Sequence, residues 1–159
     1  MKEETHRKLK EMYLHTMSSK YQELEQSPTY GQLDATEVIG IMVDAEYEKR
    51  KSTKVKRLLR HAKMKLTSAC IEDIQFSAKR NLKKSDLEPV ISGHYLQSHH
   101  NILISGATGV GKSYIACALV NQACRQGMAA LYHRATRLVE YVLAEKALGN
   151  YLKVIEKLG

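Results

Sequence analysis

Apolar residues recur every three or four positions through the first 66 residues, and this spacing predicts a small all-helical module. A first helix is expected to end at Ser27-Pro28, since proline cannot continue a helix from there. Asp34 and Glu37 have the spacing of a capping box, which predicts the start of a second helix that continues into a basic stretch. The apolar face of the first helix consists of Leu9, Met12, Tyr13, Thr16, Met17, Tyr21 and Leu24.

The pattern changes in the last third of the chain, where two short apolar runs each precede an amphipathic stretch. Residues 101–105 and 129–133 are expected to be buried strands, because both are short, apolar and followed by turn or loop residues. A helix is predicted from Lys112 until Gly127 stops it, and another from a Thr136 cap until Gly149. Together these segments predict one βαβα unit and therefore an α/β fold for residues 67–159.

A glycine-rich octapeptide separates the first apolar run from its helix and fits the pattern G-x-x-x-x-G-K-[ST]. Its glycines leave room for successive backbone N–H groups to turn toward a phosphate as an anion nest. Lys112 would reach the β- and γ-phosphates of ATP, and the Ser113 hydroxyl would ligate Mg²⁺. The alternative is a glycine-rich turn that happens to precede a helix. The predicted nucleotide-binding residues are Gly106, Ala107, Thr108, Gly109, Val110, Gly111, Lys112 and Ser113.

Positive charge is concentrated in residues 49–65, which contain nine Lys and Arg residues and no Asp or Glu. Outside this segment 16 basic residues face 17 acidic ones, so the segment accounts for the net charge of +8. Its apolar members follow helical spacing, so a helix could bury one stripe and direct cations toward a nucleic-acid backbone. A solvated basic face, or a surface for an acidic protein, is the alternative. The expected DNA-contacting residues are Lys49, Arg50, Lys54, Arg57, Arg60 and Lys63.

No apolar run approaches the roughly 18 residues that spanning a membrane requires, and the N-terminus has no secretory pattern. These features predict a cytoplasmic protein without a membrane partner. The cysteines, Cys70, Cys117 and Cys124, are odd in number and lack CxxC spacing, so they are expected to be small core residues.

Three stretches of the chain resemble the IstB-like transposition helper ATPases, which are relatives of the DnaC-type helicase loaders. They are the phosphate loop with its flanking residues, Met-Val-Asp-Ala-Glu-Tyr-Glu-Lys-Arg at 42–50 and Ile-Glu-Asp-Ile-Gln-Phe at 71–76. The resemblance covers almost the whole chain. It implies an AAA+ type ATPase with a helical N-terminal domain, which acts as an oligomer on DNA beside a cognate transposase. It also favours DNA as the partner of residues 49–65.

The chain departs from this family pattern after the phosphate loop. Family members continue into an apolar strand that ends in two acidic residues, the Walker B element, and nothing after Lys112 fits that description. We therefore expect a truncated form that binds ATP and Mg²⁺ with impaired or no hydrolysis, and we assign no catalytic residue. In the family sheet the missing strands lie between the two predicted here, so these would pair abnormally, remain exposed or recruit another chain.

The expected organisation is thus a helical domain over residues 1–66, followed over residues 67–159 by the first part of a P-loop parallel-sheet domain. An ATP-binding transposition helper is the leading hypothesis. A non-enzymatic helical module that binds DNA without sequence preference and an inert remnant of a decayed transposition gene remain as alternatives. A small-molecule kinase is a weaker one, because no lid or acceptor site is recognisable.

Overall fold

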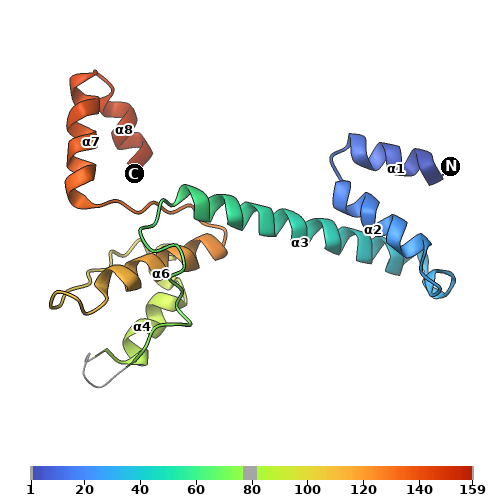
Figure 1. Cartoon of the computed structure of the whole chain (residues 1–159), viewed down its shortest axis with the longest axis horizontal. Helices are drawn as coiled ribbons and strands as arrows, with labels where there is room; N and C mark the ends of the chain where they lie inside the picture. The colour runs from blue at the N-terminus through green and yellow to red at the C-terminus, as the bar shows by residue number, and fades with distance from the viewer. Residues whose placement is uncertain (1, 77–81, 159) are drawn as a thin grey trace. The chain divides into compact units, whose positions relative to one another are not determined.

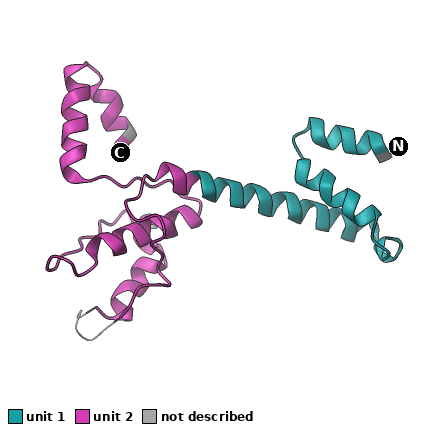
Figure 2. Cartoon of the chain, in the orientation of Figure 1, with its two compact units in different colours: residues 1–57 teal, residues 58–159 magenta. Residues whose placement is uncertain are grey.

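The computed structural model describes residues 2–76 and 82–158, and these form helices joined by loops (Figure 1). The chain divides into two compact units, residues 1–57 and residues 58–159 (Figure 2). The first unit contains α1 (Lys2–Glu11), α2 (His15–Glu25), the 3-10 helix η1 (Tyr30–Gln32) and most of α3 (Ala35–His61). The second contains the end of α3, α4 (Lys84–Ile91), α5 (His94–Gln97), α6 (Lys112–Arg125), α7 (Ala135–Ala147) and α8 (Tyr151–Leu158).

The single helix expected before Ser27 is in fact two helices, because the backbone turns at Tyr13. Tyr13 has a φ of 60°, in the left-handed region, and the Leu14 N–H donates to the Leu9 carbonyl at 2.8 Å. This is a Schellman closure of α1, which glycine usually provides. Spacing alone did not reveal the break, since the apolar pattern continues across it. Met12 and Tyr13, expected on the buried face, are exposed.

The capping box predicted for α3 is confirmed. The Glu37 N–H donates to Asp34 Oδ1 at 2.8 Å, and the Asp34 N–H donates to Glu37 Oε2 at 2.9 Å. From this start α3 runs for 27 residues. It is the longest helix of the described residues, and neither it nor any other of them is long and apolar enough to cross a membrane.

Glu46 of α3 is a buried carboxylate that caps a different helix, α2. Its Oε2 accepts hydrogen bonds from the N–H groups of Thr16 and Met17 at 3.0 and 3.1 Å. Its Oε1 accepts a hydrogen bond from Arg50 Nε at 2.8 Å. The Arg50 bond, followed by the two amides, lowers the pKa of Glu46, although burial opposes the shift. The carboxylate therefore joins α2 to α3 within the first unit.

The second unit is organised around α6, which has a face of small buried side chains. Cys117, Ala118 and Cys124 are buried in the core, as expected for the two cysteines, and burial raises the pKa of Cys124. The helix packs against Leu87 of α4 and against the chain that follows α3. Gly127 ends α6 with a φ of 84° and a Met128 N–H bond to the Ala123 carbonyl, as the sequence predicts. The buried residues of this core are Ala62, Met64, Ala69, Ile74, Leu87, Cys117, Ala118 and Cys124.

The predicted α/β fold is wrong for this structure, because residues 2–76 and 82–158 contain helices and no strand. Residues 101–105 and 129–133 are not helical, but they form no ladder with each other. Leu103, expected in a buried strand, is 94% exposed. The Tyr132 N–H donates instead to the Ala62 carbonyl at the end of α3, at 2.8 Å. The physical reason is that a parallel strand needs hydrogen-bonded neighbours, and neither apolar run has one here.

The start of α7 also differs from the prediction. Arg134, rather than Thr136, is the residue before the helix, and no side chain caps its first turn. Gly149 ends α7 as expected, with a φ of 76° and an Asn150 N–H bond to the Glu145 carbonyl at 2.9 Å. The chain then reverses into α8, and the two helices pack against each other (Figure 1).

Candidate functional site

The phosphate loop predicted at residues 106–113 has backbone angles that require its glycines. Gly106, Gly109 and Gly111 have φ values of 148°, 83° and 96°, a range that residues with a Cβ rarely adopt. The sequence pattern and the backbone therefore agree that this is a specialised turn rather than a connection open to any residue.

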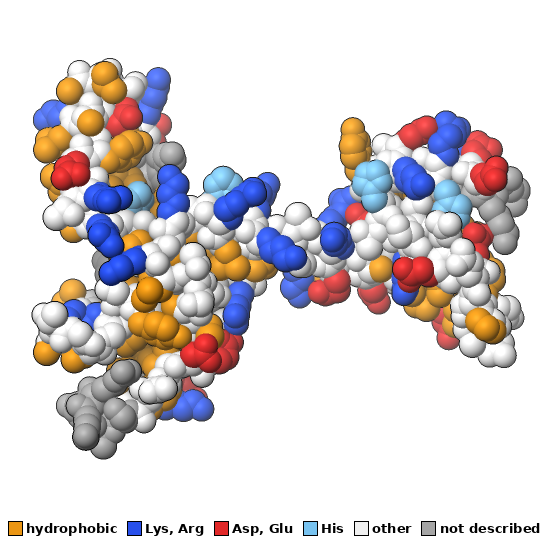
Figure 3. Space-filling model, in the orientation of Figure 1, with side chains coloured by type: hydrophobic (Ala, Val, Ile, Leu, Met, Phe, Trp, Pro, Cys, Tyr) orange, Lys and Arg blue, Asp and Glu red, His pale blue; other side chains and the backbone are white. Residues whose placement is uncertain are grey.

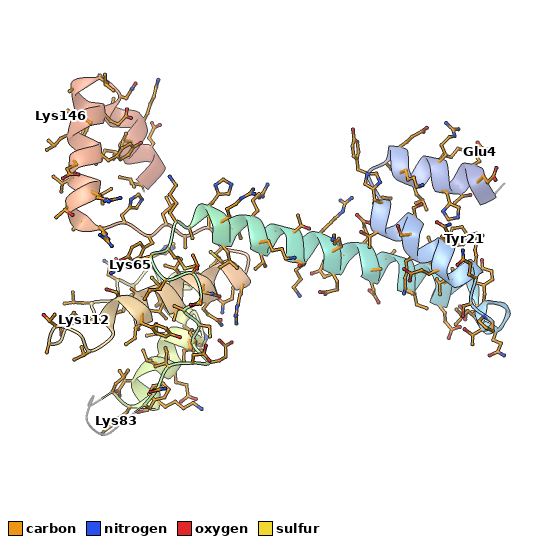
Figure 4. All side chains as sticks on the ribbon, viewed as in Figure 1. Glu4, Tyr21, Lys65, Lys83, Lys112 and Lys146 are labelled. Atoms are coloured by element: carbon orange, nitrogen blue, oxygen red, sulfur yellow. The ribbon has the colours of Figure 1, made fainter. Side chains whose placement is uncertain are left out.

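Lys112 is the first residue of α6 and folds back over the loop, beside which Figure 4 labels it. Its Nζ donates to the carbonyl oxygens of Gly106 and Ala107 at 2.8 and 2.7 Å. An ammonium group has three N–H donors, so one remains after these two bonds. The Lys112 side chain thus links the start of α6 to the start of the loop, and its positive charge lies beside the loop backbone.

The N-terminus of α6 is suited to an anion. Gly111 is the N-cap, no side chain caps the helix, and its first turn carries no acidic residue. The amide groups and the positive end of the helix dipole are therefore not neutralised by the helix's own side chains. With the Lys112 ammonium, this donor set fits a phosphate group. Ser113 follows directly and is exposed, so its hydroxyl is accessible to a metal ion bound with a phosphate.

A cavity of about 370 Å³ lies beside the loop, and sequence reasoning missed it. Val110, Gly111, Tyr114 and Ile115 form its wall on the loop and α6 side. Ile74 and Leu82, with polar Asp73 and Gln75, form the opposite wall. Ile74 belongs to a stretch that resembles the IstB-like family, and nothing in the spacing of that stretch indicates that it meets the loop. The cavity is large enough for part of a small ligand.

The structure places five of the six predicted DNA-contacting residues on α3 and Lys63 just after it. All six are exposed, and the Lys and Arg side chains along α3 reach solvent (Figure 3). At 3.6 residues per turn the five helical cations, Lys49, Arg50, Lys54, Arg57 and Arg60, occupy an arc of about 140°. Leu58 and Leu59 lie outside this arc and pack against the core of the second unit.

Arg50 differs from the other members of this set. It bonds Glu46 and also donates through Nη2 to the Tyr13 carbonyl at 3.2 Å, so it supports the first unit. Among the described residues, no carboxylate lies within 4.0 Å of Lys54, Arg57, Arg60 or Lys63. These four charges are therefore available to a partner, whereas Arg50 already has a structural role.

Comparison with known proteins gives a consistent result. The family model described as IstB-like ATP binding protein matches residues 7–158. A Pseudomonas fluorescens protein, named as an ATP-binding protein of insertion sequence IS1162, is 35% identical over 159 residues, covering 100% of this chain and 69% of that protein. Two insertion-sequence ATP-binding proteins, so named, of Sinorhizobium fredii are 33% and 30% identical over 96% and 95% of this chain. The chain spans 62% and 60% of their lengths.

Proposed function

The chain belongs to the family of IstB-like ATP-binding proteins, and we propose that it binds ATP at residues 106–113 and DNA along the basic face of α3, in support of a transposase. The observation that carries the proposal is the phosphate loop itself. Its glycines have left-handed backbone angles, and its lysine lies at the uncapped N-terminus of α6. The similar proteins are named for insertion sequences, which motivates the role in transposition.

Each part of the loop has a role in this proposal. The backbone N–H groups of residues 106–111 and the N-terminus of α6 would hold the phosphates. Lys112 would exchange its bonds to the Gly106 and Ala107 carbonyls for bonds to the β- and γ-phosphates, since a charged acceptor makes the stronger hydrogen bond. The base would enter the neighbouring cavity, where Ile74, Leu82 and Ile115 provide apolar contact.

Mg²⁺ would be held mainly by the nucleotide. The described residues contain no group of three His, Cys, Asp or Glu side chains that could bind a metal ion. The protein would therefore supply the Ser113 hydroxyl, and the nucleotide would supply phosphate oxygens. Water molecules would complete the octahedral coordination of Mg²⁺. Hydrolysis of ATP also depends on a positioned acidic pair such as the Walker B element, and the described residues after Lys112 contain no apolar run that ends in two acidic residues. We therefore propose ATP binding with slow or no turnover.

Nucleotide binding is tested by titrating the full chain with a fluorescent ATP analogue in Mg²⁺. Lys112→Ala should weaken binding about tenfold or more, because a charge-assisted contact to phosphate is lost. Lys153→Ala removes an equal charge on α8 and should leave the affinity unchanged. Equal affinity of the wild type and Lys112→Ala would refute the assignment of the loop.

DNA binding by α3 would be electrostatic and independent of sequence. Neutralising about six phosphates gives a log-affinity slope near −5 against log salt. Arg57→Glu with Arg60→Glu should weaken binding to unrelated duplexes uniformly and flatten this slope, as measured by fluorescence anisotropy. The same charge change at Lys83 and Lys84, at the start of α4, is the control. Binding that does not respond to salt, or that falls equally in both variants, would contradict the proposal.

The transposase and self-association belong to the same proposal. We propose that the protein acts as a homo-oligomer on DNA beside a cognate transposase. Light scattering of the chain with and without ATP and duplex DNA checks the first part. A particle that remains monomeric under all these conditions would remove it.

A further inference from the structure

A second cavity, of about 490 Å³, lies within the second unit and has no lining residue in common with the phosphate loop. Its walls come from the chain after α3, residues 131–134, the first half of α7 and α8. The volume is within the range of small-molecule sites. Neither the sequence patterns nor the family resemblance pointed to it.

The charged residues that line this cavity are all basic. They are Lys63, Lys65, Arg134 and Arg137, and His133 lies among them. Of the residues described, no carboxylate lies within 4.0 Å of any of the four Lys and Arg side chains. Figure 3 shows Lys and Arg side chains gathered where the chain enters α7, and Figure 4 labels Lys65 beside that stretch. Basic groups around one cavity without a counter-charge attract an anion strongly.

The backbone at the start of α7 adds hydrogen-bond donors to the same place. Arg134 is the N-cap, no side chain caps the helix, and its first turn carries no acid. Cations are unfavourable at a helix N-terminus, yet Arg134 and Arg137 lie there. A bound phosphate would accept hydrogen bonds from the uncapped N–H groups of the first turn of α7 and from the guanidinium groups of Arg134 and Arg137. Its negative charge would offset the unfavourable interaction of these cations with the helix dipole.

The remaining lining is aromatic and aliphatic. The backbone of Tyr132 is held by its N–H bond to the Ala62 carbonyl at 2.8 Å, and the side chain of Tyr141 is 40% exposed. Leu131, Val154 and Leu158 complete the apolar wall. Tyrosine rings stack with nucleobases of any sequence. A ligand that needs both a phosphate and a flat ring fits this combination better than inorganic phosphate or an acidic peptide.

We propose that this cavity binds a phosphorylated nucleoside, either as a free nucleotide or as one unit of a single-stranded nucleic acid. The phosphate contacts Arg134, Arg137 and the first turn of α7. The base lies against Tyr132 and Tyr141. The site is independent of nucleotide binding at residues 106–113, and among the predicted DNA-contacting residues it shares Lys63 with the basic face of α3.

The test uses the full chain carrying Lys112→Ala, so that the phosphate loop does not contribute. The probes are AMP and a labelled oligothymidylate of about 12 nucleotides. Arg134→Ala with Arg137→Ala should weaken binding about tenfold, and Tyr141→Leu should do so while Tyr141→Phe retains it. Lys146→Ala, at the far end of α7 and outside the cavity lining, is the control for loss of a single charge from the same helix.

The outcomes separate the two ligand sources. Competition of AMP with the oligonucleotide, lost in the double arginine variant, identifies a free-nucleotide site. Binding of the oligonucleotide alone, with the same loss, identifies a single-strand site. Unchanged affinity for both probes in the double arginine variant and in Tyr141→Leu, or an equal loss in Lys146→Ala, would overturn the proposal. Circular dichroism of each variant checks that the helix content is unchanged, and the double arginine variant keeps the test falsifiable if the leucine variant unfolds.

Discussion

Single charged side chains hydrogen-bond to backbone groups of a loop and of a helix N-terminus. Lys112 bonds two carbonyl groups of its own loop, and Glu46 accepts two amide hydrogens at the start of α2. Arg50 completes the second arrangement. These side chains form several polar contacts at once, so their replacement should have larger effects than most surface changes.

Glu46→Gln should destabilise the first unit by about 1–3 kcal/mol at neutral pH, because a charged acceptor is lost from buried contacts. The pKa of Glu46 is below its ordinary value in the folded protein. The contribution of the Glu46 carboxylate to the free energy of unfolding is therefore fully present above the ordinary carboxyl pKa. It is lost as the pH falls through the lower pKa that Glu46 has in the folded protein. Urea unfolding of wild type and variant should give a difference that is largest near neutral pH and shrinks on acidification.

Glu48→Gln is the control for this measurement, since Glu48 is exposed and its contact with Lys51 is 3.7 Å long. It should change stability by less than about 0.5 kcal/mol. A Glu46→Gln effect that is small, or that grows as the solution becomes acidic, would show that the carboxylate does not cap α2.

At the scale of helices, the sequence predicted several helix ends correctly but did not reveal where a continuous apolar pattern is divided into two helices. Asp34 with Glu37 and the glycines at 127 and 149 were identified correctly, since caps and left-handed glycines leave a local signature. The break at Tyr13 was missed, because a tyrosine performs the turn that usually needs glycine. The Arg134 start of α7 was also missed, since it has neither a cap residue nor an acidic first turn.

Residues 101–105 and 129–133, predicted as buried strands, have no regular secondary structure, and substitution tests whether they are exposed. Because Leu103 is 94% exposed, Leu103→Lys should change the free energy of unfolding by less than about 0.5 kcal/mol. Leu87→Ala, in the buried core, should cost about 2–5 kcal/mol by comparison. Chemical unfolding of both variants checks this, and a severe loss in Leu103→Lys would show that residues 101–105 are buried after all.

At the scale of the whole molecule, the family and the phosphate loop could be predicted, whereas the sheet could not. The loop pattern is local, and its glycines have the expected backbone angles. A sheet is not local, because each strand depends on partners elsewhere in the chain. The apolar runs at 101–105 and 129–133 are present in the sequence, but without hydrogen-bonded neighbours they have no regular secondary structure. The cavities at the loop and at α7 were missed for the same reason, since distant segments form them.

If the chain folds into a unit that holds ATP by its phosphate loop, ATP should raise its thermal stability. The most direct measurement is thermal unfolding of the full chain with and without Mg²⁺-ATP at about 100 times the dissociation constant. The midpoint should rise by about 5–10 °C for the wild type and by clearly less for Lys112→Ala, in which only the cavity at α7 could still bind a nucleotide. A broad transition that ATP does not move, or an equal shift in both proteins, would contradict it.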